Sequence, residues 1–539
     1  MPTAINTALM KLRKRAEGTD PEVLVETFVD TGSLFAQLSS SNHQLIYGRR
    51  GTGKTHVLQY LAATARERDD VAIYVDLRIV GSSGGLYADT SISLAERGSR
   101  LLVDTLSYVH DQLTDYVLNA TFQSNEDFGR ACQALDQLAG AITDVRVVGT
   151  TETESKASTS ASREASATLG LSAQIPNISA EIAAKRSAGE SQEERTLERG
   201  VVRHRVSFGS VATHLTNLTN ALPTKRMWLL LDEWSSLPQD LQPLLADMIK
   251  RCVLPVRGLT VKIAAIEQRS RFRVQVDGND IGIELGADLS ADVDLDDFMV
   301  FGNDPERARN FFRELFQKHV KAQLAADGDE RGGPSTSDEF VRTTFTQHNA
   351  FDELVRAAEG VPRDAINVVA IAAQQAADNL IAVSHVRAAA RSWYGRDKET
   401  AVEANPEALR LLHWIIDRVI RHRRARAFLL QQGEPSRHPL IGSLYDARVL
   451  HVLKRGISSR DHAGLRFNVY GLDYGCYVDL MATASAPQGL LPADTDDPAR
   501  EAEFVEVPPD DYRAIRRAIL ELSEFEQEPT PAGDRPQTG

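Results

Sequence analysis

Eight residues near the start of the chain combine glycines with a lysine and a threonine in a spacing that suits phosphate binding. The segment Gly48–Thr55 reads GRRGTGKT, with the apolar run Leu45–Tyr47 before it and the apolar-periodic segment His56–Ala65 after it. Glycines let the backbone curl so that successive N–H groups point at phosphate oxygens, and the start of the following helix adds positive potential. In this pattern the lysine reaches the β- and γ-phosphates, and the threonine hydroxyl holds Mg²⁺.

The order of strand, loop and helix around this segment predicts a nucleotide site. Lys54 is the expected catalytic lysine, and Thr55 is an expected metal ligand. The residues of this segment expected to bind the nucleotide are Gly48, Arg49, Arg50, Gly51, Thr52, Gly53, Lys54, Thr55 and His56. No guanine-reading NKxD pattern is present, and the sequence leaves ATP and GTP otherwise undecided.

Two acids follow a strongly apolar run later in the chain. Met227–Leu231 reads MWLLL, and Asp232 and Glu233 come directly after it. An apolar run that ends in acids is typical of a central strand ending at the active-site edge of a parallel sheet. Combined with a phosphate loop, the pattern predicts that Asp232 holds Mg²⁺ through water and that Glu233 polarises the attacking water.

A third group of polar residues follows another apolar run. Val261–Ile266 predicts a buried strand, and Gln268 is the side chain beyond it best placed to touch the γ-phosphate or the attacking water. Three arginines come next, at Arg269, Arg271 and Arg273. Either one of them reaches the nucleotide of a neighbouring subunit, or all three form a solvated basic loop.

An arginine also opens a predicted helix in the region from residue 303 to about 396, which has helical character throughout. Gly360–Arg363 reads GVPR and precedes the alanine-rich segment Ala365–Leu380. An arginine at the start of such a lid helix can swing onto the γ-phosphate, which would link nucleotide state to domain angle. Arg363 is therefore a candidate for both nucleotide binding and catalysis, and the alternative is an ordinary capping arginine.

Length and composition limit the class of protein. The 539 residues allow two to four domains with substantial cores, and the contents of 42% apolar and 25% charged residues are ordinary for a globular protein. The net charge of −14 argues against a protein coated in nucleic acid, although it permits a local basic face. Three separated cysteines imply neither a disulfide scaffold nor a zinc site. Without a long apolar run or a signal-peptide core, the expected compartment is the cytoplasm.

The segment 144–205 differs from its surroundings because it is rich in Ser, Ala, Thr and Glu. From Ala157 to Ile175 small or apolar residues alternate with polar ones, which is the period of a strand. One hairpin register pairs apolar with apolar residues and also places Arg163 opposite Glu190. We therefore favour a long β-hairpin, while a mobile low-complexity insertion and an alanine-rich helix stay open. A hairpin could pair between subunits of a ring or, through residues 150–200, line a membrane pore.

Residues 405–485 predict a small domain with a basic surface. Expected helices at Glu407–Arg421 and Leu440–Lys454, followed by expected strands at Leu465–Tyr470 and Tyr477–Leu480, suggest a winged helix. This region has twelve Lys and Arg against seven Asp and Glu, a net of +5.

The densest basic run in this domain is Arg421–Arg426, and Lys454, Arg455, Arg460 and Arg466 lie near the expected wing. This clustering fits phosphate contacts on duplex DNA. The alternative is a basic surface that docks the acidic tail or the nucleotide-binding core.

Two acidic stretches are expected to carry no chemistry. Asp288–Asp297 predicts a solvated loop, because it lacks the mid-loop glycine and terminal glutamate of a calcium loop. The tail from residue 486 is expected to be mostly flexible, with one helix at Asp510–Glu524.

Taken together, GRRGTGKT, LLLLDE, a strand with a polar end, GVPR on a helical lid and a terminal winged helix resemble AAA+ ATPases of the origin-recognition type, close to the STAND signalling NTPases. The resemblance covers roughly residues 30–485 apart from the insertion. It implies that Gln268 is the first sensor and Arg363 the second. The chain departs from the family pattern in its insertion and in the EQR sequence, which replaces the more usual Asn or Thr at the end of the sensor strand.

The predicted fold is α/β, with a parallel phosphate-loop core, a helical lid, a C-terminal winged helix and a hairpin-like insertion. The expected parts are an N-terminal lead-in at 1–30, the core at 31–302 with its insertion at 144–205, the lid at 303–400, the winged helix at 401–485 and the acidic tail at 486–539.

The predicted function is an Mg²⁺-dependent ATPase switch that couples ATP to a winged helix, to duplex DNA through 405–485 and to homo-oligomers. The alternative is a STAND-like signalling or defence ATPase, in which the insertion drives assembly or membrane action and the winged helix only packs. A nucleotide-locked scaffold with negligible turnover is a third reading.

Overall fold

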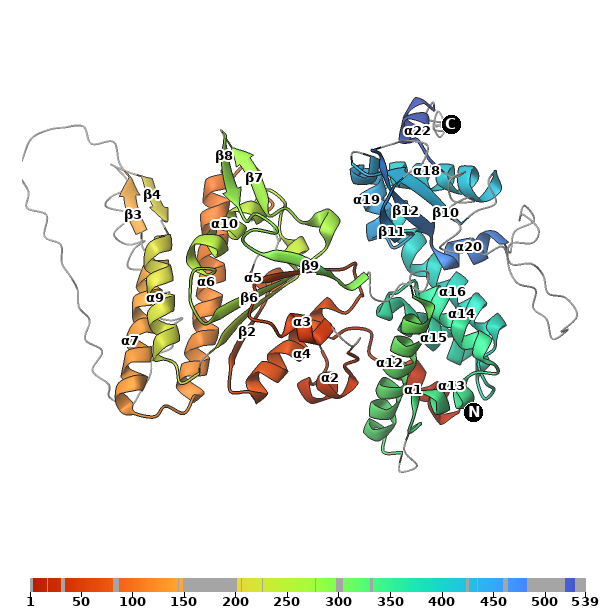
Figure 1. The fold of residues 1–539 in the computed structure, drawn as a ribbon, viewed down its shortest axis with the longest axis horizontal. Coiled ribbons are helices and arrows are strands. Elements are labelled where there is room, and N and C mark those ends of the chain that lie inside the picture. Colours follow the sequence, from red (N-terminus) through yellow and green to blue (C-terminus); the bar gives the residue numbers. More distant parts are fainter. Residues whose placement is uncertain are drawn as a thin grey trace, which may run out of the picture.

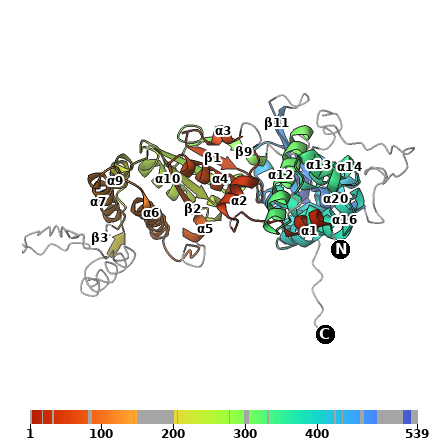
Figure 2. The ribbon, with the colours of Figure 1, turned by 90° about the horizontal axis from the view of Figure 1, so that it is seen from below.

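The computed structural model shows an elongated molecule, with a sheet and its covering helices in one half and the lid and C-terminal elements in the other (Figures 1 and 2). The structure describes residues 3–16, 18–30, 34–80, 87–143, 145–148, 201–204, 206–224, 226–276, 278–296, 304–329, 333–422, 426–433, 435–458, 464–481 and 519–528. Among these residues, no helix is long and apolar enough to cross a membrane.

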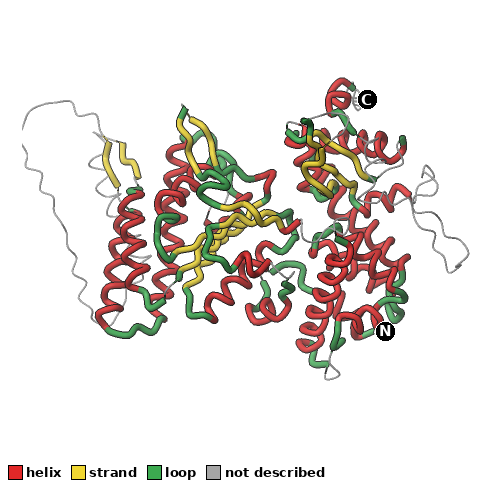
Figure 3. Tube along the Cα trace, in the orientation of Figure 1, coloured by secondary structure: helices red, strands yellow, loops and turns green. Residues whose placement is uncertain are grey.

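A five-stranded parallel sheet forms the core of the first half (Figure 3). Its strands are β1 (Gln44–Tyr47), β2 (Val71–Asp76), β5 (Met227–Asp232), β6 (Leu259–Ala265) and β9 (Ser290–Asp294). They lie in the order β2-β5-β6-β1-β9. All six residues of β5 are buried, which explains its continuous apolar character. Because the strands are parallel, the carboxyl ends of β1, β5 and β6 meet at one edge, as the sequence predicts.

Helices cover both faces of this sheet, and successive strand residues point to opposite faces. Leu229 and Leu231 of β5 pack in the cluster formed with α6, α7, α9 and α10, whereas Trp228 and Leu230 pack with α3 and α4. These helices are α3 (Leu34–Leu38), α4 (Lys54–Glu67), α6 (Leu94–Asn119), α7 (Asn125–Ile142), α9 (Phe208–Ala221) and α10 (Gln242–Cys252), with the short α5 at Leu77–Val80.

Two small hairpins extend from this half. At the start and end of the insertion, β3 (Val145–Val148) pairs antiparallel with β4 (Val201–His204). The hairpin predicted inside the insertion, including the pairing of Arg163 with Glu190, lies outside the described residues, as do residues 150–200. The second hairpin pairs β7 (Arg273–Val276) with β8 (Asn279–Gly282).

The lid is helical and includes the first helix of the chain. Its helices are α12 (Pro305–Ala326), α13 (Ser337–Thr344), α14 (His348–Ala358), α15 (Pro362–Ala376) and α16 (Val383–Trp393). Helix α1 (Ala4–Lys11) packs on them through Ala8 and Leu9, and the Asn6 side chain donates to the Ala377 and Asn379 carbonyls. Helix α2 (Pro21–Thr27) then leads back to the sheet.

A π-helical turn (Tyr394–Glu399) and α17 (Thr400–Glu403) connect the lid to the C-terminal elements. These are α18 (Pro406–Ile415) with a π-helical extension to Arg421, β10 (Ala427–Gln431), a 3₁₀ turn at Pro435–Arg437, α19 (Pro439–Asp446), β11 (Leu450–Ser458), β12 (Arg466–Leu472), α20 (Tyr474–Met481) and α22 (Leu522–Gln527). The three strands form an antiparallel sheet in the order β10-β12-β11. The domain thus combines helices with a three-stranded antiparallel sheet, and the winged helix stays a prediction.

Two predicted elements of this domain are wrong. The helix expected at Leu440–Lys454 ends at Asp446, because Arg448 takes a left-handed backbone conformation (φ 60°) and the chain continues as β11. The strand expected at Tyr477–Leu480 is helix α20, whose first amides are capped by the Asp473 carboxylate.

Two acidic stretches are also more ordered than predicted. Half of the loop expected at Asp288–Asp297 is β9, the fifth strand of the core sheet, which pairs with β1. In the tail, residues 510–518 of the helix expected at Asp510–Glu524 lie outside the described residues, 519–521 are not helical, and the short helix α22 begins at Leu522. Leu520 donates to the Leu429 carbonyl at the edge of β10.

Candidate functional site

The phosphate loop has the geometry that its sequence predicts. It joins β1 to α4, and two of its glycines take left-handed conformations, with φ 88° at Gly51 and 95° at Gly53. Gly51 must also be small, since a Cβ there would lie 2.7 Å from the Cβ of Arg363. The Arg363 amide donates to the Gly51 carbonyl at 3.2 Å, so the lid helix α15 touches the loop directly.

Lys54 folds back over this loop. Its Nζ donates to the Gly48 carbonyl at 2.8 Å and to the Arg49 carbonyl at 2.9 Å. Burial lowers the pKa of Lys54, and the charges of Asp232 and Glu233 oppose that shift. The lysine therefore lies between the loop and the two acids, ready to exchange its carbonyl contacts for phosphate oxygens.

Asp232 lies beside the phosphate loop at the end of β5, with 1% of its surface exposed. Its carboxylate accepts hydrogen bonds from the Thr55 hydroxyl, from the Tyr74 hydroxyl at 2.7 Å and from the Glu233 amide at 2.8 Å. Burial raises the pKa of Asp232 despite these bonds. The two residues predicted as metal ligands are thus in contact, as a shared Mg²⁺ requires.

This donor set fits magnesium bound together with a nucleotide. A hydroxyl and a carboxylate are the hard oxygen ligands that Mg²⁺ prefers, and the ion usually completes its shell with water and phosphate oxygens. Within the described part of the chain, no group of three or more His, Cys, Asp or Glu side chains could hold a metal by itself.

Glu233 lies at the same edge in an unusual backbone conformation. Its φ of 56° is left-handed, and its Oε2 accepts a hydrogen bond from the Ser236 hydroxyl at 3.1 Å. Left-handed non-glycine residues are strained and occur often at functional sites. Both Glu233 and Ser236 line a cavity.

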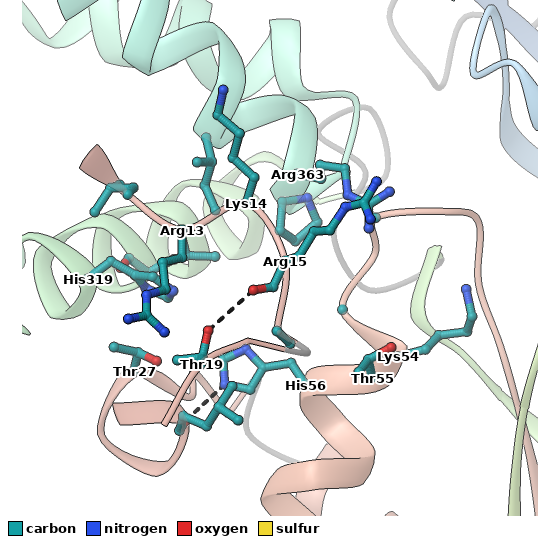
Figure 4. Close-up of a pocket in the computed structure, with 18 of the residues that line it drawn as sticks. Arg13, Lys14, Arg15, Thr19, Thr27, Lys54, Thr55, His56, His319 and Arg363 are labelled. Carbon is teal, nitrogen blue, oxygen red and sulfur yellow. Dashed lines mark hydrogen bonds between the residues drawn. The ribbon is translucent and has the colours of Figure 1, made fainter. Parts of the chain in front are cut away.

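The cavity has a volume of about 450 Å³ and extends from the phosphate loop to the lid. Lys54 and Thr55 lie at one end, and Arg13, Thr27 and His319 lie at the other (Figure 4). Of the predicted residues, Arg50, Gly51, Gly53, Lys54, Thr55, His56, Glu233 and Arg363 line it. The structure therefore brings most of the predicted site together.

Part of the cavity wall is the N-terminal segment 12–27, which carries Arg13, Lys14 and Arg15. The predictions from sequence did not include these three basic residues. In the sequence, these residues form only a short basic run within a helical lead-in. They reach the cavity because α2 packs against α4, and this contact is fixed by His56, whose Nε2 lies 2.8 Å from the Leu24 carbonyl.

The side chain of Arg49 points away from the cavity. It is 1% exposed and pairs with Asp296, with Nε–Oδ1 2.8 Å and the Arg49 amide to Oδ2 2.9 Å. Its guanidinium also donates to the Glu359 carbonyl at 3.1 Å and contacts His451 Nδ1. Arg49 thus joins the phosphate loop to the C-terminal domain, a role that its place in GRRGTGKT did not indicate.

A chain of buried polar groups continues from His451. Its Nε2 lies 3.1 Å from the Asp473 carboxylate, and Asp473 also pairs with Lys398. Lys398 pairs in turn with Asp364 at 3.0 Å, beside Arg363 on the lid helix. Burial lowers the pKa of His451 to about 3, so its ring is neutral. It donates to Asp473 through Nε2 and accepts from Arg49 through Nδ1.

The structure does not bring Gln268 to the cavity. Strand β6 delivers Ile266 to the cavity wall, and a 3₁₀ turn at Glu267–Arg269 then leaves the Gln268 side chain exposed. Gln242 fixes this turn, because its amide donates to the Arg269 carbonyl at 3.1 Å and accepts from the Arg271 amide at 2.6 Å.

The three arginines beyond this turn have different surroundings. Arg269 pairs with Asp446 of the C-terminal domain, and Arg273 pairs with Asp280 of the neighbouring strand. Arg271 has an exposed side chain. Of the three candidates for contact with another subunit, Arg271 is therefore the best placed.

Several arginines of the predicted DNA-binding surface are instead used within the molecule. Arg455 pairs with Glu267 at 2.8 Å and with Asp294 at 3.2 Å, and Arg426 pairs with Glu359 of the lid. Arg418 pairs with Glu528 of the tail at 3.1 Å. These three arginines therefore hold the C-terminal domain to the core, to the lid and to the tail. Residues 423–425 and Arg460 lie outside the described part.

Comparison with known proteins identifies one matching family. The model of the ORC-CDC6-like family matches residues 13–351, a range that includes the phosphate loop, Asp232 and Glu233. No curated protein matches the chain. Among solved structures, the chain is similar to the Aeropyrum pernix Orc1 protein in complex with DNA, at 14% identity over 87% of this chain and 93% of that chain, with a TM-score of 0.29.

Replacing Asp232 by asparagine is expected to make stability depend differently on pH. Because burial raises the pKa of Asp232 above its usual value of about 3.9, the stabilisation from this group is present at low pH and is lost as the pH rises through the folded-state pKa. Urea denaturation without nucleotide, between about pH 4 and about pH 8, should therefore show the variant gaining stability relative to the wild type as the pH rises.

The exposed Asp115→Asn variant on α6 controls for the loss of one carboxylate. If the stability difference between Asp232→Asn and the wild type stayed constant over this pH range, the described environment of Asp232 would be wrong.

Proposed function

The chain belongs to the ORC-CDC6-like family, and on that premise we propose that it is an Mg²⁺-dependent ATPase whose nucleotide state sets the position of its C-terminal winged helix. The observation that carries this proposal is the buried chain of polar contacts that begins at Arg49 in the phosphate loop. It runs through His451 and Asp473 of the C-terminal domain and then through Lys398 to Asp364, the residue next to Arg363.

Hydrolysis in this proposal depends on the groups around the cavity. Glu233 accepts a proton from the attacking water, and Lys54 stabilises the negative charge on the transferred phosphoryl group. Arg363 approaches the γ-phosphate from the lid. Bound Mg²⁺, held by Thr55 and Asp232, would neutralise charge on the phosphate oxygens.

Coupling follows from the shared atoms of the phosphate loop. Lys54 holds the Arg49 carbonyl, while the Arg49 side chain holds Asp296 and His451. When Lys54 turns to bind a phosphate, its hydrogen bonds to the Gly48 and Arg49 carbonyls are lost. The loop then moves, and the Arg49 side chain moves with it. Buried polar groups tolerate few intermediate geometries because unpaired charges are costly in a low dielectric. The winged helix therefore responds in a discrete step.

Duplex DNA is the proposed partner of the winged helix. Support comes from the net charge of +5 in residues 405–485, although several of these arginines are already paired within the molecule. Lys454 and Arg466, on the two strands that flank the wing, have exposed side chains. We also propose that a second copy of the chain brings its Arg271 to the nucleotide.

Glu233→Gln is expected to keep ATP binding within about threefold of the wild type and to lower turnover by about 100-fold or more, because only the proton acceptor is lost. Equilibrium titration with ATP and a phosphate-release assay measure the two effects. Glu306→Gln, at an exposed position outside the cavity, is the control. Substantial turnover in Glu233→Gln would refute the role of this residue as base, and negligible turnover in the wild type would favour a nucleotide-locked scaffold.

The double variant Arg49→Met with Asp296→Asn is expected to uncouple the winged helix from the nucleotide. Both members of a buried pair are removed together, so neither charge is left alone. In the wild type, ATP should change hydrogen exchange of the β11 and β12 amides, whereas the double variant should bind ATP without that change. An equal ATP-dependent change in both proteins would rule out Arg49 as the coupling residue.

Duplex DNA binding is expected to weaken steeply with salt, and Arg423→Ala with Arg424→Ala should reduce the slope of log K against log salt by about 2. Fluorescence anisotropy at several salt concentrations measures this. Arg410→Ala is the control, because Arg410 already pairs with Glu407 at 3.2 Å. If the wild type bound no duplex at low salt, the winged helix would be a packing module.

A further inference from the structure

The end of the cavity far from the phosphate loop is the place for a nucleoside base. Lys54 and Thr55 fix the phosphates at the other end, so the base of a nucleotide bound there must extend toward the lid (Figure 4). That end is lined by Leu24, Thr27 and His56 from the core side and by Leu315 and His319 from α12. This inference rests on the proposed function, since it takes a nucleotide as the ligand.

The tautomer of His319 follows from its hydrogen bond. Its Nδ1 lies 2.9 Å from the Leu315 carbonyl, which can only accept, so Nδ1 carries the proton. Burial, with the neighbouring His56 as the next contribution, lowers the pKa of His319 to about 4. A neutral ring with its proton on Nδ1 has a lone pair on Nε2, and His319 therefore offers a hydrogen-bond acceptor.

His56 reinforces this arrangement. Its ring centre lies 6.4 Å from that of His319, and its Nε2 donates to the Leu24 carbonyl. Each imidazole thus uses a ring N–H on a backbone carbonyl, and that N–H is not available to a base.

We propose that His319 Nε2 accepts a hydrogen bond from the 6-amino group of adenine and thereby selects ATP over nucleotides that carry an oxygen at position 6. Adenine presents N–H donors at this position, whereas guanine and hypoxanthine present a carbonyl oxygen that would face the lone pair. An unmatched polar contact in a partly buried site is strongly unfavourable, so one such group discriminates effectively.

The other groups on the Watson–Crick edge of guanine are also a poorer match to this site. Its adjacent N1–H and 2-amino donors call for two acceptors close together, as one carboxylate supplies. Among the described residues that line the cavity, the only carboxylate is Glu233, which lies at the phosphate end. Arg13 also lines the base end, where one of its five N–H groups donates to the Gly18 carbonyl.

Calorimetric titration with ATP, ITP and GTP in the presence of Mg²⁺ tests the assignment. ITP differs from ATP chiefly in having oxygen and a ring N–H in place of the 6-amino group and ring nitrogen. The wild type should bind ATP about tenfold or more tightly than ITP. His319→Phe should reduce this ratio to about threefold or less, because the ring is kept and the acceptor is removed. His319→Gln, whose amide retains an acceptor oxygen, should keep part of the preference.

Arg15→Ala is the matched control, since Arg15 lines the same cavity and its side chain points toward Arg363 and not toward His319 (Figure 4). This variant should weaken the binding of ATP and of ITP by the same factor and leave the ratio of the two affinities unchanged. Equal binding of ATP and ITP by the wild type, tighter binding of GTP than of ATP, or an unchanged ratio in His319→Phe would each overturn the assignment. If no nucleotide bound to the wild type, the proposed function itself would fail, which is a distinguishable result.

Discussion

The ion pair between Arg49 and Asp296 is the interaction on which the arrangement of the whole molecule depends. It joins the end of β1, the end of β9 and the C-terminal domain at a point where the arginine is only 1% exposed. Burial alone would raise the pKa of Asp296, but the charge and hydrogen bonds of Arg49 hold it below its usual value. Loss of one member of such a pair typically costs about 3–5 kcal/mol, because the other charge stays buried without compensation.

Strand β9 brings Asp296 to this pair. Its neighbour β1 supplies the backbone partners, and the two parallel strands carry Arg49 and Asp296 out of the sheet at the same edge. Tyr445 of α19 donates to the same carboxylate at 3.0 Å and lies under the Arg49 guanidinium. The phosphate loop is therefore held from both sides, by the lid helix at Gly51 and by the C-terminal domain at Arg49.

Local pattern was sufficient to predict the phosphate loop, the acids after β5 and the lid arginine, because each of these features is defined by glycine spacing or a strand end within a few residues of sequence. It was insufficient where the partner is remote. Asp296 lies 247 positions from Arg49, and its acidic neighbours made the segment resemble a solvated loop. Gln268 was chosen by its distance from a strand end, but the turn held by Gln242 directs its side chain outward. In Leu440–Lys454 the apolar residues fit both the helical and the strand period, so the sequence does not show where the helix ends. The left-handed backbone at Arg448 marks that end.

The return of residues 519–528 to the C-terminal sheet has a consequence for solubility. Strand β10 is an edge strand, and such edges are templates for pairing with other chains unless something covers them. The contact between Leu520 and Leu429 occupies that edge, and Phe525 fills a gap beside Trp414 under the Arg410 side chain. The tail segment thus acts as an intramolecular seal, which protects the protein from self-association through this sheet.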